Sequence, residues 1–151
     1  MLKASNGGGG RGMRVIREED ELRRAFNESK REALNAFGDD TVFLEKFVDF
    51  KQEISVAATR YQDGKISIYE PSENKHENGI LRYSKIPANI DQNLFKKSQE
   101  ITKLICENLD YVGTLCIEFL ITNSNELLYN EQSCRPHNSY WNSVNSHNVS
   151  Q

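Results

Sequence analysis

The sequence predicts an α+β fold in which a small glycine-loop lobe accompanies a larger antiparallel sheet with helices on one face. Three observations favour it. Four consecutive glycines stand at residues 7–10, and residues 18–37 and 91–109 space their apolar side chains as amphipathic helices do. Runs rich in β-branched and aromatic residues, separated by polar turns, fill most of the remainder. A length of 151 residues suits one domain with a small lobe attached.

The glycine run lies between cations, with Lys3 before it and Arg11 and Arg14 after it. Glycine loses more backbone entropy on folding than any other residue, so such a run is expected where the main chain approaches a ligand closely or takes positive φ. Exposed backbone N–H groups and a lysine ammonium together suit a phosphate group. A flexible linker is the alternative, but strand-like alternation resumes at Met13.

The first fifty residues predict the order strand, loop, strand, helix, strand. A short strand is expected at Met13–Arg17, and a helix at Glu18–Phe37, opened by acids and closed by Gly38. The apolar segment Thr41–Val48 predicts the next strand.

In the second part, Asp63-Gly64 is the strongest hairpin signal and predicts pairing of Gln52–Arg60 with Lys65–Tyr69. The polar stretch Glu70–Pro87 has few periodic cues and is interpreted as loop-rich. A second helix is expected at Asp91–Leu109. Strands at Tyr111–Ile121 and Glu126–Asn130 are then expected to pair across the turn at 122–125.

Two acids occupy these last strands. Glu118 interrupts an apolar run, and Glu131 directly follows another, where neutral residues would cost less. If the strands pair, the two carboxylates can face each other and either share a proton or hold Mg²⁺ beside substrate phosphates. The alternative places Glu118 on the solvent face of an edge strand. A candidate anion clamp follows within seven residues of Glu131: Arg135, His137 and Asn138.

Composition excludes several function classes. A net charge of −3 and a pI near 5.7 do not give the excess of positive charge that binds nucleic acid or an acidic membrane. No apolar run is long enough to span a bilayer, and no signal peptide is recognisable. Three cysteines without CxxC spacing predict neither a disulfide framework nor a zinc site. A cytoplasmic protein is expected, either monomer or homodimer.

Two resemblances cover nearly the whole chain. Residues 3–17, 19–22, 36–38 and 43–47 resemble the ATP lid of biotin carboxylase and pyruvate carboxylase. From about residue 50 the segments 52–56, 73–81, 109–113, 117–119 and 130–139 resemble carboxyaminoimidazole ribonucleotide synthetase, the purine-pathway carboxylase. Both are ATP-grasp families that phosphorylate bicarbonate. The resemblance therefore implies an ATP-grasp fold, with a lid subdomain at residues 1–49 and a core subdomain at 50–151.

The resemblance changes within residues 47–50, which suggests an engineered chimera joining a lid of about residues 1–48 to a core of about 49–151. The chain also begins at the phosphate-binding lysine and stops just past the metal-binding strand. A minimal or designed unit is therefore hypothesised, with the polar tail at 140–148 serving as a solubilising replacement.

Site residues are carried over from the resemblance. For phosphate binding it implies Lys3 and the backbone of Gly7, Gly8, Gly9 and Gly10. For the adenine side it implies Glu45, Lys46, Phe47 and Val48, with Met13 also contacting the nucleotide. The ribose or substrate side would be formed by Glu53, His76 and Asn78. Glu118 and Glu131 would bind Mg²⁺, and Arg135 would clamp bicarbonate or carboxyphosphate, with Lys3 and Arg135 as the catalytic pair.

Three departures from the families affect function. Glu77 stands where the purine enzyme commonly has arginine, Ser133 replaces a metal-side asparagine, and Tyr140-Trp141 replaces Gly-His. A second phosphate-binding lysine has no counterpart in the sequence. Three functions are therefore considered: Mg-ATP binding between the lobes with phosphoryl transfer to bicarbonate or water, a non-catalytic ATP/ADP-binding module, and a designed folding scaffold.

Overall fold

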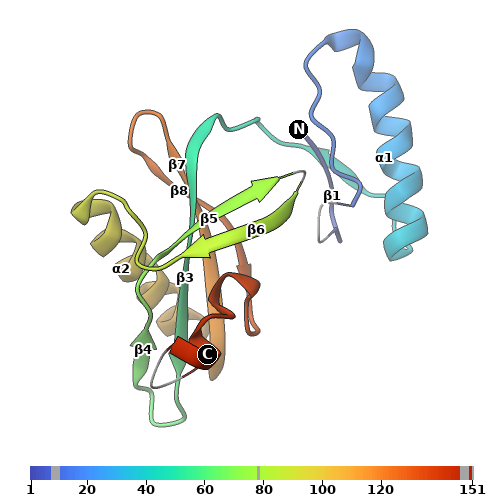
Figure 1. Ribbon diagram of the computed structural model, residues 1–151. Helices are drawn as coiled ribbons and strands as arrows, with labels where there is room; N and C mark the ends of the chain where they lie inside the picture. Colours follow the sequence, from blue (N-terminus) through green and yellow to red (C-terminus); the bar gives the residue numbers. More distant parts are fainter. Residues whose placement is uncertain (8–10, 78, 147–149, 151) are drawn as a thin grey trace. The chain divides into compact units, whose positions relative to one another are not determined.

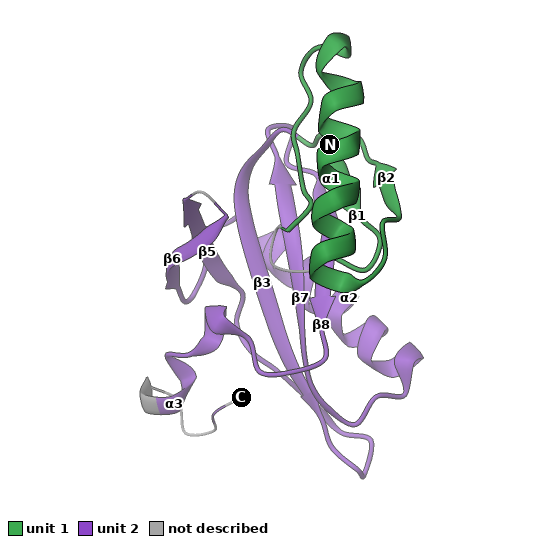
Figure 2. Ribbon diagram, turned by 90° about the vertical axis from the view of Figure 1, so that its right-hand side faces the viewer, with its two compact units in different colours: residues 1–48 green, residues 49–151 purple. Residues whose placement is uncertain are grey.

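A computed structural model describes residues 1–7, 11–77, 79–146 and 150. The chain divides into two compact units, residues 1–48 and 49–151, coloured separately in Figure 2. Gly8, Gly9, Gly10 and Asn78, all predicted site residues, lie outside the described residues. None of the helices in the described part of the chain is both long and apolar enough to cross a bilayer.

Unit 1 is a two-stranded sheet with one helix. β1 (Leu2–Ala4) pairs antiparallel with β2 (Val42–Leu44), and the 3₁₀ turn η1 (Glu19–Glu21) leads into α1 (Leu22–Phe37). The helix predicted over Glu18–Phe37 is thus confirmed from Leu22 onward, whereas Glu19–Glu21 form the 3₁₀ turn instead. It ends as expected, since Gly38 takes a left-handed φ of 74° and donates its N–H to the Leu34 carbonyl.

Two strand predictions in unit 1 need correction. Met13–Arg17 forms no strand, because only Arg14 bridges to Leu2. The Arg14 side chain instead points to α1, where its guanidinium donates to both carboxylate oxygens of Glu32 at 3.0 and 2.6 Å. These hydrogen bonds lower the pKa of the Glu32 carboxyl. The strand expected at Thr41–Val48 is confined to Val42–Leu44, because β1 offers only three partners.

Unit 2 is built on one antiparallel sheet. Its main path runs β6-β5-β3-β7-β8, and β4 pairs with β3 off this path (Figure 1). The strand bounds are β3 Phe50–Arg60, β4 Ile66–Ile68, β5 Ser72–Glu77, β6 Ile80–Lys85, β7 Gly113–Thr122 and β8 Leu127–Ser133. The predicted β3–β4 hairpin and the predicted pairing of the last two strands are both confirmed.

Helix α2 (Gln92–Leu109) covers one face of this sheet. Alternate residues of β3, among them Ile54 and Val56, pack there with Ile117 and Phe119 of β7. Leu94 and Cys106 of the helix belong to the same core. The opposite sheet face is thereby left to the intervening, more polar residues.

The segment Glu70–Pro87, expected to be a loop, is instead the antiparallel hairpin β5–β6. The prediction was wrong because the strand does not alternate apolar with polar residues. Ser72 and Asn74 are its buried residues, and their polar groups are satisfied by neighbouring strands rather than by water. A period-two search for apolar residues cannot detect such a strand.

The C-terminal segment crosses the sheet face opposite α2 (Figures 1 and 2). It contains the 3₁₀ turn η2 (Asn138–Tyr140) and the short helix α3 (Ser143–Ser146). Tyr140 is fully buried, so the expectation that this tail only solubilises the surface is wrong at that residue. Trp141 remains 70% exposed.

Asp91 provides a test of the fold. Its carboxylate caps α2 by accepting the N–H of Asn93 at 2.8 Å. Replacing Asp91→Ala leaves that N–H without its side-chain acceptor and should lower the free energy of unfolding by about 1 kcal/mol in urea denaturation. Asp91→Asn retains an acceptor and serves as the control. Equal losses in the two variants would contradict the capping role.

Candidate functional site in unit 2

Most predicted site residues of unit 2 lie on the sheet face opposite α2. β3 places Glu53, Ser55 and Ala57 on this face, in alternation with the core residues Ile54 and Val56. The pairing Ser55↔Glu118 extends the same face to β7, and Glu118↔Glu131 extends it to β8. The sheet register therefore brings these acids onto one surface although they are far apart in the sequence.

Glu118 and Glu131 are directly opposed, as the sequence predicted. β7 lies between β3 and β8, so the alternative of an edge strand for Glu118 is excluded. The Glu118 side chain is 18% exposed, and its Oε1 lies 3.0 Å from Nε2 of His137. A β-bulge directly after Glu118 shifts the register between the strands at this point.

His137 was not assigned a partner from the sequence, yet it is the residue that contacts Glu118. It is buried, and its Nδ1 lies 2.7 Å from Oγ of Ser139. The backbone N–H of Ser139 also points to this ring nitrogen, at 3.4 Å. One ring nitrogen is thus engaged by its own turn and the other by the carboxylate. The sequence offered only the proximity of His137 to Glu131 as a signal.

Arg135 has an exposed side chain, and its Nη1 donates to the Pro136 carbonyl at 3.0 Å. In the part of the chain that the structure describes, no three His, Cys, Asp or Glu side chains form a group able to hold a metal ion by themselves. Side chains of these four types would therefore not complete the ligand set of a cation held by Glu118 and Glu131. Mg²⁺ in nucleotide enzymes takes such a set, with one or two carboxylates plus phosphates and water.

Glu53 and His76 form a second pair on the same face. The carboxylate of Glu53 contacts Nδ1 of His76 across β3 and β5. They line a cavity of about 190 Å³ together with five neighbours, Phe50, Lys51, Gln52, Asn74 and Lys75. The structure thus joins two of the three residues predicted for the ribose or substrate side.

A buried polar network supports this face and was missed from the sequence. Asn74 donates from Nδ2 to Oγ of Ser55 at 2.6 Å, and its Oδ1 accepts from Ser84 at 2.8 Å and from Ser72 at 3.2 Å. These bonds connect β3, β5 and β6. No buried side-chain nitrogen or oxygen in the described ranges lacks a hydrogen-bond partner. The network lies largely in the segment interpreted as a loop, which is why sequence reasoning did not find it.

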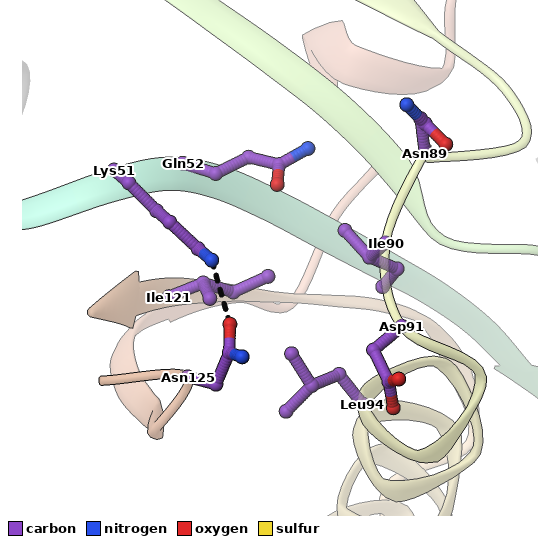
Figure 3. Close-up of a pocket in the computed structure, with 8 residues that line it drawn as sticks. All are labelled: Lys51, Gln52, Asn89, Ile90, Asp91, Leu94, Ile121 and Asn125. Carbon is purple, nitrogen blue, oxygen red and sulfur yellow. Dashed lines mark hydrogen bonds between the residues drawn. The ribbon is translucent and has the colours of Figure 1, made fainter. Parts of the chain in front are cut away.

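Another cavity of unit 2, of about 330 Å³, lies at the other side of the sheet between the start of α2 and the β7–β8 turn (Figure 3). Lys51 Nζ donates to Asn125 Oδ1 there at 2.6 Å, and Gln52 and Asn89 also line the cavity. None of the residues lining this cavity was predicted as a site residue.

The predicted residues of unit 1 lie within that unit. Lys3 of β1 forms an ion pair with Glu45, so the predicted phosphate ligand and an adenine-side acid are brought together. Gly7 closes a turn by donating its N–H to the Ala4 carbonyl at 3.1 Å. Met13 is exposed, and residues 46–48, predicted on the adenine-binding strand, follow the end of β2 instead.

Burial affects the thiol and phenol groups around the sheet face. It raises the pKa of the Cys116 thiol to about 12, and the nearby Glu118 carboxylate acts in the same direction. The pKa of Tyr129 is raised by burial and then by Glu131. Cys106 belongs to the buried face of α2, and burial raises the pKa of its thiol, whereas Cys134 is exposed.

The chain matches the ATP-grasp domain over residues 1–151. N5-carboxyaminoimidazole ribonucleotide synthase from Bacillus subtilis (strain 168) is 38% identical over 140 residues, which are 92% of this chain and 35% of that protein. The chain spans between 35% and 41% of the length of the first three curated relatives.

Solved structures agree with this match. The ADP complex of an N5-carboxyaminoimidazole ribonucleotide synthetase is 34% identical, with a TM-score of 0.85 over 99% of this chain and 38% of that chain. A biotin carboxylase-β-γ-ATP complex from Campylobacter jejuni is 27% identical, with a TM-score of 0.87 over 92% of this chain and 32% of that chain. The ATP-grasp fold expected from the sequence is thereby confirmed.

Thiol reactivity tests the burial of the site face. At pH 8, well below the raised pKa of Cys116, an aromatic disulfide reagent should modify one thiol per native chain, Cys134. The variant Cys134→Ser should then show no fast reaction. Denaturation should expose all three cysteines of the wild-type chain. Fast modification of two thiols in the native protein would contradict the described packing.

Proposed function

The chain belongs to the ATP-grasp family, and from this premise we propose that it binds Mg-ATP and transfers the γ-phosphoryl group to bicarbonate or, without an acceptor, to water. The observation that carries the proposal is the opposed pair Glu118 and Glu131, with Glu118 held by a buried histidine. The relatives named above are an N5-carboxyaminoimidazole ribonucleotide synthase and a biotin carboxylase, the two families whose resemblance to this sequence implies bicarbonate as the acceptor.

In this proposal unit 1 acts as the lid subdomain and unit 2 as the core subdomain. The Lys3 ammonium would bind phosphate oxygens together with the backbone N–H groups of the glycine run at residues 7–10. Residues 45–48 would line the adenine pocket, and Met13 would contact the nucleotide. Lys3 forms an ion pair with Glu45, so phosphate binding would exchange a carboxylate partner for a phosphate partner.

The residues of unit 2 fit a divalent cation by their chemistry. Two carboxylates face each other on neighbouring strands, and oxygen ligands of this kind are those that Mg²⁺ prefers. When bound, the cation would neutralise the negative charge that the phosphates carry during transfer. His137 holds one oxygen of Glu118, which fixes the carboxylate and leaves its second oxygen for the site.

The remaining predicted residues would position substrate. The Glu53–His76 pair borders the 190 Å³ cavity and would contact the ribose or the acceptor side. The Arg135 guanidinium would leave its contact with the Pro136 carbonyl and clamp the bicarbonate or carboxyphosphate anion. Positioning and electrostatics supply most of the catalysis in phosphoryl transfer.

A non-catalytic nucleotide-binding module is the second candidate. Two observations favour it: the Arg135 guanidinium is turned to the neighbouring Pro136 carbonyl, and Glu77 stands where the purine enzyme commonly has arginine. The hypothesis of a designed chimera or scaffold is not needed to explain the sequence, because one curated family matches 92% of the chain in a single alignment.

A nucleotide-dependent thermal shift tests the binding proposal. Mg-ATP at a hundredfold excess over its dissociation constant should stabilise the protein by about 2.7 kcal/mol. Lys3→Ala should weaken nucleotide binding about tenfold, because it removes a charge-assisted hydrogen bond to phosphate. Lys97→Ala, an exposed lysine on α2, is the matched control. Equal thermal shifts in both variants would show that Lys3 does not contribute to nucleotide binding. The absence of a shift in the wild type would contradict nucleotide binding.

Glu131→Gln separates catalysis from binding. The substitution keeps the side-chain shape but removes the charge of one proposed metal ligand, so ADP release from Mg-ATP should fall at least a hundredfold. Binding of ADP without divalent cation should stay within about twofold of wild type, because the metal is then not involved. Glu126→Gln in the β7–β8 turn is the control. Equal loss of both properties would contradict the metal role, and absent turnover in the wild type would favour the binding module.

A further inference from the structure

Tyr140 anchors the C-terminal segment to the sheet. It is fully buried, whereas Arg135, Asn138 and Trp141 around it are exposed. Its ring packs on Ala57 and Cys116, which belong to β3 and β7. His137 and Ser139 of this segment are also buried, but Tyr140 has its largest buried side chain and so fixes the position of the segment on the sheet.

The hydroxyl of Tyr140 determines where the ring sits. It lies 2.8 Å from the Ser55 carbonyl and 2.9 Å from the Glu70 carbonyl, so its single proton can be donated to either. The ring also meets Tyr69 edge to face at 5.6 Å between centroids. Burial raises the pKa of Tyr140, so the hydroxyl keeps this proton and stays a donor. An unpaired buried hydroxyl would be costly, which ties the ring to these two carbonyls.

Both ends of the η2 turn contact the same pair of strands. At one end Tyr140 bonds to the carbonyl of Ser55, the residue that pairs with Glu118. At the other end His137 contacts the Glu118 carboxylate itself. The turn between them is closed by the Tyr140 N–H, which donates to the His137 carbonyl at 3.1 Å. A shift of the Tyr140 ring would therefore move the turn and, three residues earlier in the chain, the His137 imidazole.

We propose that Tyr140 is a positioning residue that holds His137 against Glu118 and so sets the orientation of this carboxylate for a divalent cation. The part concerning the cation rests on the proposed function. The sequence did not predict this role for Tyr140. The resemblance showed only that Tyr140-Trp141 replaces Gly-His. A glycine there would have no side chain to bond to β3, so in this chain it is the Tyr140 side chain that holds the turn.

The first arm of the test needs no ligand. Trp141 is the single tryptophan of the chain and directly follows Tyr140, so its fluorescence reports on the segment. Tyr140→Phe keeps the ring but removes the hydroxyl, and should increase the amplitude of fast depolarisation of Trp141. Thr102→Val is the matched control, because it removes a buried hydroxyl that donates to the Ser98 carbonyl within α2, away from the turn. Equal depolarisation in wild type and both variants would overturn the anchoring role.

The second arm measures Mn²⁺ binding by electron paramagnetic resonance in the presence of ADP. Tyr140→Phe should raise the Mn²⁺ dissociation constant about tenfold, as changes to the partners of a metal ligand typically do. Thr102→Val should stay within about twofold, and ADP binding without a cation should be unchanged in both. A wild type that takes up Mn²⁺ with a Tyr140→Phe variant that binds it equally well would overturn the positioning role alone.

A wild type that takes up no Mn²⁺ with ADP would instead overturn the proposed metal function and, with it, the link from Tyr140 to the cation. The anchoring of η2 by Tyr140 would then be tested by the Trp141 depolarisation alone. The two failures are therefore distinguishable.

Discussion

The antiparallel pairing of β3 with β7 is the interaction on which the rest of unit 2 depends. It runs from Phe50↔Thr122 to Arg60↔Gly113 and is the longest pairing in the sheet. Because side chains alternate along both strands, this one register sends Ile54, Val56 and Ile117 to α2 and Ser55 and Glu118 to the opposite face. A slip of one residue would exchange the core for the acids, so the hydrophobic core also specifies the site.

The polar face is stabilised in a different way from the apolar one. Burying the α2 face removes apolar surface from water, whereas the other face buries hydroxyl, amide and imidazole groups that must find partners. Asn74 forms hydrogen bonds with three serines from three strands, and the Tyr140 hydroxyl lies within hydrogen-bond distance of two carbonyls. Such a network is stabilising only when it is complete, which gives the face a defined geometry for the acids on it.

Sequence reasoning recovered the elements that carry strong local signals. The helix ends at Gly38 and Leu109, the turn at Asp63-Gly64 and the pairing of Glu118 with Glu131 were all predicted. It failed at β5, whose buried residues are Ser72 and Asn74, and at Met13–Arg17, where the Arg14 side chain turns to Glu32 instead of extending a strand. In each case a partner distant in the sequence overrode the local pattern.

The sequence by itself determined the ATP-grasp fold, the C-terminal ends of the two long helices and the two opposed acids, because these follow from periodicity, capping residues and recognisable motifs. Only the tertiary structure decided which side chains complete the site face. His137 on Glu118, His76 on Glu53 and Tyr140 on Ser55 are contacts between elements, fixed by sheet register and by burial of hydrogen-bonding groups. No local pattern encodes such a contact, because its free energy depends on a partner that reaches the site only when the sheet has formed.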